Sequence, residues 1–213
     1  MKLYTQRAAC SLASHIIAYE LGLDMEVVRV DRATRRASDG QDYLAINPNG
    51  YVPALVLDDG EILTEGTAIL QYLAGLKPET GLIPEDAKGQ RLIQSLLNFI
   101  ATELHKPMAQ MMIADYTQVK EALYKHVAPR LDWIAGRLTG DYLLGENFSV
   151  ADAYLFVCLN WSQWNGIDLS RWPKLEAFMQ RVGQRPAVRL ALEAEGLAPR
   201  AQGVFFAPPA LAA

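Results

Sequence analysis

The fold is decided by residues 49–67, which read NGYVPALVLDDGEILTEGT. In this stretch the apolar run Ala54 to Leu57 is separated from Ile62 to Leu63 by Asp58-Asp59-Gly60. Asp-Gly between apolar runs is a strong signal of a β-hairpin. Val52-Pro53 precedes the first of these strands, and a proline is tolerated in a central strand only where it opens it, often through a cis peptide bond. The stretch therefore predicts a hairpin whose first strand follows a proline.

The segments on either side of this hairpin complete an α/β unit. Strand patterns cover Lys2 to Thr5 and Glu26 to Val30, with the helical pattern Leu12 to Leu21 between them. After the hairpin, apolar residues at helical spacing predict a helix from about Gly66 to Leu76. The resulting order, βαβ-α-ββα, is that of thioredoxin-like folds. Residues 1–80 are therefore predicted to form a thioredoxin-like domain.

The second half of the chain shows helical patterns without strand-like alternation. Prolines and glycines at 77–84 mark a linker. Helical runs follow near 86–113, 117–138, 150–164, 174–183 and 187–195. Residues 86–197 are therefore predicted to form an all-helical bundle, in which Ser149 and Asp152 make a capping box of structural importance. The tail, 198–213, has no periodicity and is expected to drape over the surface or to be disordered.

Composition and charge exclude several classes of protein. With 213 residues, 51% of them hydrophobic, the chain can bury a core without a metal or disulfides. The net charge of −4, without a run of lysine or arginine, argues against a nucleic-acid partner. The N-terminus lacks the apolar core of a signal peptide, and no apolar run approaches the roughly 20 residues that span a bilayer. We therefore expect a cytoplasmic protein without a membrane partner. The histidines His15, His105 and His126 show no metal-ligand spacing, so no metal is expected.

Cys10 lies between the first strand and the first helix, at or beside the helix N-cap. Free backbone N–H groups and the helix dipole favour a thiolate at such a position, which makes Cys10 a candidate reactive group. The position is equally consistent with a small residue that packs a turn. Because there is no second cysteine at CxxC spacing, redox chemistry would need an external thiol. Cys158, inside an apolar helix, is expected to lie in the core.

Two segments beside the hairpin could bind the end of a peptide. If the Val52-Pro53 bond is cis, the N–H and C=O of Val52 are free to pair with an extended ligand. An ordinary turn proline is the alternative. The N–H groups of Gly66 and Thr67 lie at a helix start and can bind a carboxylate, while Glu65 could hold an ammonium or merely favour the helix dipole. Together these features predict a site for a zwitterionic amino-acid end.

A second group of polar candidates lies on the long helix of the second half. Asn98, Thr102 and His105 fall at i, i+4 and i+7, which places them on one stripe of an otherwise apolar surface. Such a stripe usually lines a cleft, although a lone histidine is more often a packed core or interface residue. Pro107 is expected to kink the helix.

Separate motifs, in the same order along the chain, give a resemblance to the beta class of bacterial glutathione S-transferases. They are Ala9–Ile16, Asn47–Leu55, Thr64–Gly66, Asn98–Lys106 and Ser149–Tyr154. The resemblance extends to about Leu197. It implies glutathione as the co-substrate and a homodimeric, detoxifying transferase without a metal.

The resemblance also implies roles for individual residues. Cys10 and His105 would be the catalytic groups beside the glutathione sulfur. Glutathione would be bound by Arg35, Val52, Pro53, Glu65, Gly66, Asn98, Thr102, Glu103 and Lys106. Among these, Asn98 and Glu103 match positions that can reach the site of the neighbouring subunit. An apolar electrophile would lie near Met108, Met111, Met112 and Trp164, although methionines at this spacing are as often plain core.

The implied activity is transfer of the glutathione thiolate to small apolar electrophiles, with thiol transfer or peroxide reduction through Cys10 as side activities. One alternative is a redox enzyme in which Cys10 is the obligate nucleophile, and another is a non-catalytic carrier of apolar ligands. An isomerase of the maleylacetoacetate type is disfavoured, because its serine-rich loop is absent. The chain departs from the wider pattern at Thr5, Tyr51, Gly66 and Pro107, which are expected to affect substrate preference.

Overall fold

The computed structural model describes residues 1–201 and 203–209. Its strands β1 (Lys2–Thr5), β2 (Glu26–Arg29), β3 (Ala54–Val56) and β4 (Ile62–Thr64) form one sheet in the order β2-β1-β3-β4. β1 is parallel to β2, whereas β3 is antiparallel to both β1 and β4. The hairpin predicted around Asp58-Asp59-Gly60 is therefore confirmed at the sheet edge. Gly60 has a φ of +90°, a conformation that favours glycine.

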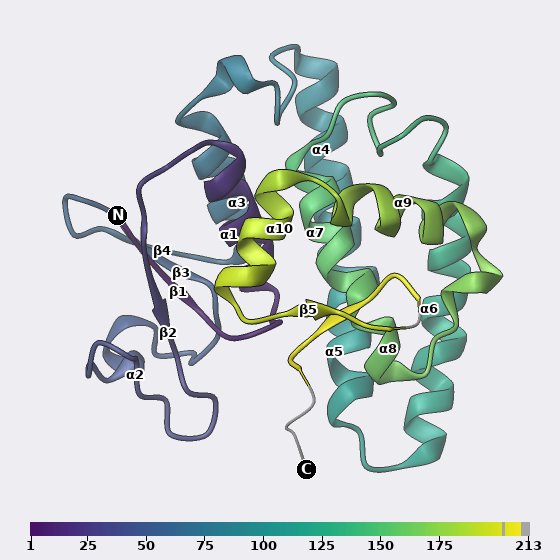
Figure 1. The fold of residues 1–213 in the computed structure, drawn as a ribbon, viewed down its shortest axis with the longest axis horizontal. Coiled ribbons are helices and arrows are strands. Elements are labelled where there is room, and N and C mark those ends of the chain that lie inside the picture. The colour runs from purple at the N-terminus through teal and green to yellow at the C-terminus, as the bar shows by residue number, and fades with distance from the viewer. Residues whose placement is uncertain (202, 210–213) are drawn as a thin grey trace.

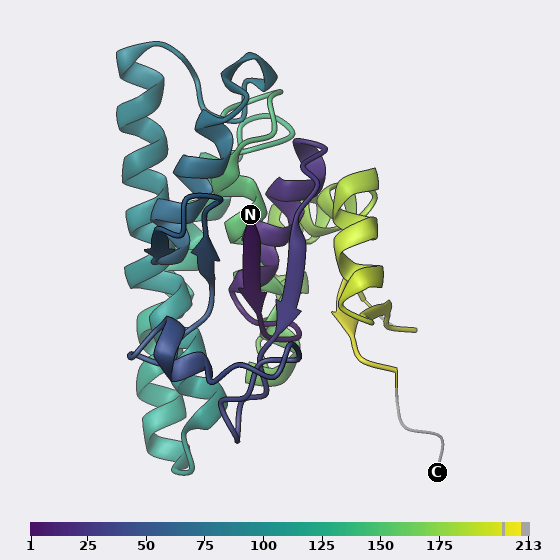
Figure 2. The same ribbon diagram turned by 90° about the vertical axis from the view of Figure 1, so that its left-hand side faces the viewer.

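Three helices accompany this sheet. They are α1 (Ser11–Glu20), α2 (Tyr43–Ile46) and α3 (Gly66–Gly75), and a short 3₁₀ turn, η1 (Pro78–Thr80), follows them. α1 and α3 pack against each other and present Leu12, Ile16 and Ile69 to the core. Figure 2 looks onto the sheet, with the helices of the second half behind it and to both sides. The thioredoxin-like fold predicted for the first part of the chain is confirmed.

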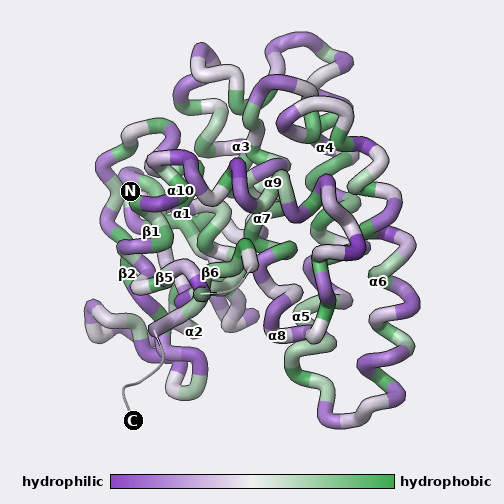
Figure 3. The backbone as a smooth tube through the Cα atoms, turned by 45° about the vertical axis from the view of Figure 1, so that its right-hand side comes forward, coloured by the Kyte–Doolittle hydropathy of each residue, from purple (hydrophilic) through white to green (hydrophobic). Residues whose placement is uncertain are grey.

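The second half is helical, as predicted. Its elements are α4 (Ala87–Phe99), η2 (Ile100–His105), α5 (Lys106–Ile113), α6 (Thr117–Arg137), α7 (Val150–Asn160), α8 (Ser162–Asn165), η3 (Leu169–Arg171), α9 (Pro173–Gly183) and α10 (Pro186–Ala194). α7 is buried along its whole length, and its tube is mainly green in Figure 3, whereas the outer α6 alternates between green and purple. A helix that is apolar on all sides needs neighbours all around it, and α7 is the centre of this half.

The capping box at the start of α7 is confirmed. The backbone N–H of Ser149 donates to Asp152 Oδ2 at 2.9 Å, and the N–H of Leu143 donates to Oδ1 at 2.8 Å. Asp152 is fully buried, so these donors replace the water that its carboxyl group loses. The box thus fixes both the start of α7 and the loop before it.

The two halves share one continuous core and a polar latch. Buried side chains from Leu3 in β1 to Leu192 in α10 belong to the same apolar cluster. Arg185 donates to both carboxylate oxygens of Glu20 at 2.7 and 2.9 Å, and its guanidinium lies 4.0 Å from the centroid of the Phe148 ring. Because this bidentate pair joins α1 to the start of α10, it holds the halves in a fixed orientation.

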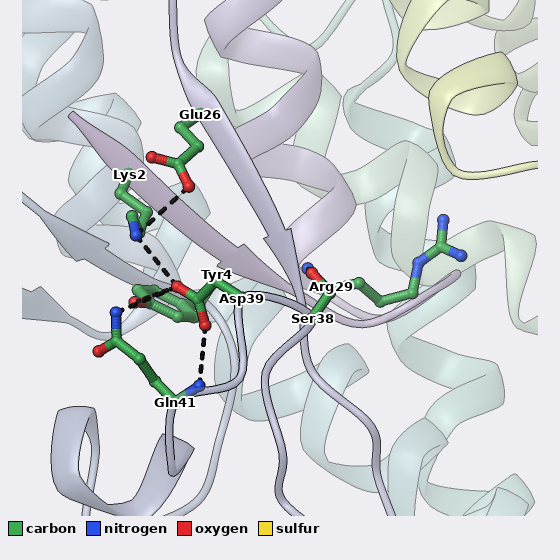
Figure 4. A network of polar contacts seen from close by, with 7 residues as sticks. All are labelled: Lys2, Tyr4, Glu26, Arg29, Ser38, Asp39 and Gln41. Atoms are coloured by element: carbon green, nitrogen blue, oxygen red, sulfur yellow. Dashed lines mark hydrogen bonds and ion pairs between the residues drawn. The ribbon is translucent and has the colours of Figure 1, made fainter.

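The segment between β2 and α2 is fastened to the strands β1 and β2 (Figure 4). Lys2 lies between Asp39 and Glu26, with Nζ to carboxylate distances of 3.0 and 3.3 Å. Asp39 also accepts hydrogen bonds from the backbone and side-chain amides of Gln41, both at 3.1 Å. These contacts anchor a long polar segment whose far end carries Arg35, one of the predicted ligand-binding residues.

The tail is more ordered than its sequence indicates. β5 (Ala198–Pro199) pairs with β6 (Phe206–Ala207), as the yellow end of the chain in Figure 1 shows. Asn160 exchanges two hydrogen bonds with the backbone of Phe206, at 2.8 and 2.9 Å, and the ring of Phe206 packs against Phe156. Disorder is therefore the wrong expectation for this part of the tail. Positions 202 and 210–213 lie outside the described residues.

Candidate functional site

The predicted cis peptide bond is present between Val52 and Pro53. The thiol of Cys10, the N-cap residue of α1, donates to the carbonyl oxygen of Val52, with Sγ and O 3.1 Å apart. The preceding carbonyl, that of Tyr51, accepts hydrogen bonds from the Tyr43 hydroxyl at 2.5 Å and the Asn47 amide at 2.7 Å. The chain just before β3 is thus held from both sides and brought against the start of α1.

The helix start does not make Cys10 a thiolate in this structure. Part of its side chain is accessible, yet burial in apolar surroundings raises the pKa of the thiol to about 12. The N–H groups of Cys10 and Ser11 and the charge of Lys106 act in the opposite direction and are outweighed. The N-cap position left a reactive thiolate and a small packed residue as alternatives, and desolvation, the larger effect here, favours the neutral thiol. Cys10 is a neutral hydrogen-bond donor at neutral pH.

Glu65 and Gly66 lie beside Val52 and Pro53. The hairpin register pairs Ala54 with Thr64, so the residues before β3 and after β4 share one end of the sheet. A Cβ atom added to Gly66 would be 3.7 Å from the Pro53 ring, in ordinary contact. Both segments predicted to bind a peptide end are therefore adjacent.

The carboxylate of Glu65 is not used by the helix that it precedes. Glu65 is the N-cap residue of α3, but its side chain is exposed and makes no capping hydrogen bond. Its φ of +69° is uncommon for a residue with a side chain and costs on the order of 1 kcal/mol or more. A strained backbone that projects an unengaged carboxylate is typical of a binding site rather than of a helix cap.

Arg35 also has a positive φ, of +57°. Its Nη1 donates to the carbonyl oxygen of Gly50 at 2.7 Å. Gly50 has a φ of +68°, and a Cβ atom there would be 3.3 Å from Leu44, so both conformation and space favour glycine. The guanidinium of Arg35 therefore lies against the loop that leads to Val52.

The predicted polar stripe is not formed. Residues 100–105 adopt a π-helix, η2, instead of continuing α4. In a π-helix each residue rotates the chain by a smaller angle than in an α-helix. Residues seven positions apart, such as Asn98 and His105, therefore no longer lie on the same face of the helix. Asn98 and Thr102 are exposed, while His105 turns inward. Pro107 contributes to the interruption, because it has no N–H to donate to the carbonyl of Glu103.

His105 is held by two aromatic residues of the helical half. Its Nδ1 is hydrogen-bonded to the hydroxyl of Tyr154, and its ring centroid lies 5.1 Å from that of Trp161, edge to face. Burial, assisted by the charge of Lys106, lowers the pKa of His105 to about 4. His105 is therefore neutral at neutral pH. Sequence reasoning assigned no role to Tyr154, although it closes the last of the motifs quoted above.

The neighbours Glu103 and Lys106 point to different partners. Glu103 Oε2 accepts from Arg130 Nε at 2.9 Å and lies 3.3 Å from His126 Nε2, both on α6. The Arg130 contact lowers the pKa of Glu103. Lys106 Nζ instead lies 5.1 Å from the centroid of the Tyr51 ring. Lys106 is thus directed toward the segment before β3, and Glu103 toward α6.

The four predicted electrophile-binding residues differ in accessibility. Met108 is 0% and Met111 3% exposed, and both belong to the main core. Met112 is half-buried, and Trp164 is 38% exposed. Met108 and Met111 are therefore core residues, the alternative that their spacing left open. They can affect a ligand-binding surface only through the side chains packed over them.

Two general features of the described residues bear on function. No group of three or more His, Cys, Asp or Glu side chains within 1–201 and 203–209 could hold a metal ion. In the same ranges, no helix is both long and apolar enough to cross a bilayer.

Comparisons with known proteins agree with this geometry. The family model described as "Glutathione S-transferase, N-terminal domain" matches residues 1–75, and that of the C-terminal domain matches 99–186. The glutathione S-transferase GstA of Escherichia coli O157:H7 is 42% identical, over 92% of this chain and 100% of its own length. The chain therefore belongs to the glutathione S-transferase family.

Solved structures place it more narrowly. A ternary complex of BphK, a bacterial glutathione S-transferase, superposes with a TM-score of 0.90 at 49% identity, covering 92% of this chain and 100% of that one. A sphingomonad glutathione S-transferase complexed with glutathione gives a TM-score of 0.87 at 44% identity, covering 93% and 100%. Because a bacterial beta-class enzyme from Sphingomonas chungbukensis is also among the neighbours, at 44% identity, the resemblance inferred from the sequence motifs is confirmed.

Proposed function

We propose that this protein transfers the thiolate of glutathione to small apolar electrophiles. The observation that carries the proposal is the meeting of Val52, Cys10 and the Glu65-Gly66 pair at one end of the hairpin. Lys106 reaches the same place from the helical half. A glutathione complex of a similar sphingomonad enzyme supports the choice of tripeptide.

Each part of glutathione has a matching group in this proposal. The backbone of Val52 pairs with the cysteinyl residue as a short added strand. Glu65 binds the γ-glutamyl ammonium, and the N–H of Gly66 at the start of α3 binds its carboxylate. Arg35 lies near the glycine carboxylate. Pro53 holds the segment in shape, and Thr102 completes the set within this subunit. Asn98 and Glu103 would reach the site of a second subunit.

The chemistry follows from the charge states of the groups around the sulfur. The glutathione thiol loses its proton before attack, and its thiolate accepts a hydrogen bond from the neutral thiol of Cys10. The ammonium of Lys106 and the N–H groups at the start of α1 stabilise the negative charge of the glutathione thiolate. His105 is neutral, so it acts as a polar neighbour rather than as a cation. The proton of the thiol passes to solvent, and the thiolate then forms a carbon–sulfur bond. In substitution it displaces a halide ion from an aryl halide, and in addition to an activated alkene the resulting carbanion takes a proton from water.

The apolar partner would lie along the accessible side chains, Met112 and Trp164, with Met108 and Met111 supporting them from the core. In the thiol-transfer side activity, the Cys10 sulfur would attack a glutathione-containing disulfide, forming a Cys10–glutathione disulfide and releasing the other thiol, and a second glutathione would then reduce it. In the peroxidase side activity, a peroxide would oxidise Cys10 to a sulfenic acid, which condenses with glutathione to the same disulfide and releases water. We propose a cytoplasmic homodimer, with domains at 1–80 and 86–197.

The proposal is tested by glutathione conjugation with a panel of aryl halides and activated alkenes. We expect turnover that saturates in both substrates with the native protein. Saturable binding of apolar ligands without turnover across the panel would instead favour the carrier alternative. Loss of all turnover in Cys10→Ala would favour the obligate redox enzyme.

A further inference from the structure

Tyr51 and Lys106 join the two halves of the molecule beside Cys10. Tyr51 immediately precedes Val52, whose carbonyl accepts the Cys10 thiol hydrogen, whereas Lys106 begins α5. Lys106 Nζ lies 5.1 Å from the centroid of the Tyr51 ring, within the range of a cation–π contact. Tyr51 is 65% exposed, so its ring does not pack in the core of this chain.

The backbone and the side chain of Tyr51 have separate roles. Its carbonyl is fixed by the Tyr43 hydroxyl and the Asn47 amide, at 2.5 and 2.7 Å. On the side of Tyr51 these hydrogen bonds involve only the backbone carbonyl, so they would persist if the Tyr51 ring were removed. The position of Val52 is therefore secured independently of the Tyr51 ring.

An exposed lysine does not by itself keep its charge in one place. Lys106 has a flexible stem and a strongly hydrated head, and its side chain is exposed. A cation–π contact at an exposed site favours the held position by roughly two- to fivefold. The contact with Tyr51 therefore raises, by that factor, the fraction of time that the ammonium of Lys106 spends over the ring.

The position of that charge matters to Cys10. The charged and titratable groups that act on this cysteine are Lys106 and Glu65, of opposite sign, while Tyr43, Tyr154 and Cys158 are neutral neighbours. His105, next to Lys106, is also neutral at neutral pH. Lys106 is thus the group that opposes the negative charge of Glu65 at the sulfur.

We propose that Tyr51 is a positioning residue whose ring holds the ammonium of Lys106 beside Cys10, where it favours a negatively charged sulfur. The inference goes beyond the proposed function, in which the same charge would act on the glutathione thiolate. It can be tested without glutathione, because Cys10 itself reports the local field. Its failure is therefore distinguishable from failure of the proposed transferase activity.

The experiment compares alkylation of Cys10 by iodoacetamide, which is neutral, and by iodoacetate, which is anionic, at mildly alkaline pH. Cys158 is fully buried and is not expected to react. The variant Cys10→Ala, which retains only Cys158, is the control that checks this. We expect Tyr51→Ala to lower the ratio of the iodoacetate rate to the iodoacetamide rate by about threefold, because the anion loses its nearby cation. Tyr51→Phe keeps the ring and should match the native ratio.

Lys106→Gln is the matched comparison, because it removes the charge and leaves the ring. It should lower the ratio at least as far as Tyr51→Ala, and the double variant should show no further decrease beyond Lys106→Gln. A loosened loop would speed both reagents alike and leave the ratio unchanged. An unchanged ratio in Tyr51→Ala would overturn the proposal.

Discussion

The thiol of Cys10 donates a hydrogen bond to the carbonyl oxygen of Val52 across 3.1 Å. This contact joins the start of α1 to the segment proposed to pair with the glutathione backbone. Because burial raises the pKa of Cys10 to about 12, its proton is retained at neutral pH. The structure therefore favours Cys10 as a donor to a neighbouring sulfur rather than as the main nucleophile.

This assignment predicts different outcomes for conjugation and for redox chemistry. Cys10→Ala should reduce conjugation by about tenfold, since a hydrogen bond to a charged sulfur contributes about 1.5 kcal/mol when the donor is a weak one such as a thiol. Cys10→Ser keeps a hydrogen-bond donor, so its conjugation rate should lie between those of the native protein and Cys10→Ala. Thiol transfer should disappear in both variants. Parallel assays of the two activities check this, and a hundredfold loss of conjugation in Cys10→Ser would refute the donor role.

The neutral state of His105 predicts a pH dependence of stability. Burial lowers the pKa of His105 to about 4, below its value in the unfolded chain of about 6.5. The folded state therefore resists protonation, and stability is lost as the pH falls from about 6.5 to about 4. Linkage puts the loss at up to about 3 kcal/mol.

The pH dependence is measured by urea unfolding of the native protein and His105→Asn, at neutral pH and near pH 4. Other groups titrate in both proteins, so the difference between them isolates His105. We expect the native protein to lose more stability on acidification than the variant. Equal losses would mean that the pKa of His105 is the same in the folded and the unfolded chain, which would contradict the prediction.

Gly66 has room for a serine side chain. A Cβ atom would lie 3.7 Å from the Pro53 ring, so Gly66→Ser should fold with unchanged stability. Its hydroxyl adds a donor at the start of α3, which should tighten glutathione binding up to about fivefold. Gly50→Ser is the contrasting control, because its φ of +68° should make it less stable by about 1–2 kcal/mol. Thermal unfolding and glutathione titration distinguish the two.

The ordered tail predicts that Phe206 contributes to stability. Its ring lies against Phe156, and a Cβ atom on Gly183 would come within 2.8 Å of it. Phe206→Ala should destabilise the fold by about 2 kcal/mol, less than a fully buried phenylalanine, because the side chain is half-buried. Pro208→Ala, at an exposed position of the same tail, should change little. Equal unfolding midpoints for the two variants would argue against the packing role.

Elements with strong local signals could be predicted from the sequence. The Asp58-Asp59-Gly60 turn fixed the hairpin, and Ser149 with Asp152 fixed the start of α7. The proximity of Val52 and Glu65 could be predicted from the same hairpin, because antiparallel strands joined by a short turn bring their two outer ends together. These features depend on neighbouring residues, which is where sequence patterns are most informative.

Features that depend on tertiary packing could not be predicted. The π-helix breaks the α-helical periodicity that placed Asn98 with His105, and it accompanies a contact with Tyr154 from a distant helix. The charge state of Cys10 stayed open because the N-cap position is visible in the sequence, whereas the burial that raises the pKa of its thiol is not. The tail was missed because its strands are too short to show alternation, and Asn160, which holds them, lies far away in the sequence.

The most direct test is calorimetric titration of the native protein and of Glu65→Gln with reduced glutathione. Glu65 is exposed and makes no capping hydrogen bond, so its replacement should leave the fold intact. We expect saturable binding to the native protein and an affinity at least about tenfold lower for the variant, because a charge-assisted contact with the γ-glutamyl ammonium is lost. Absence of binding to the native protein, or equal affinities, would contradict the proposed glutathione site.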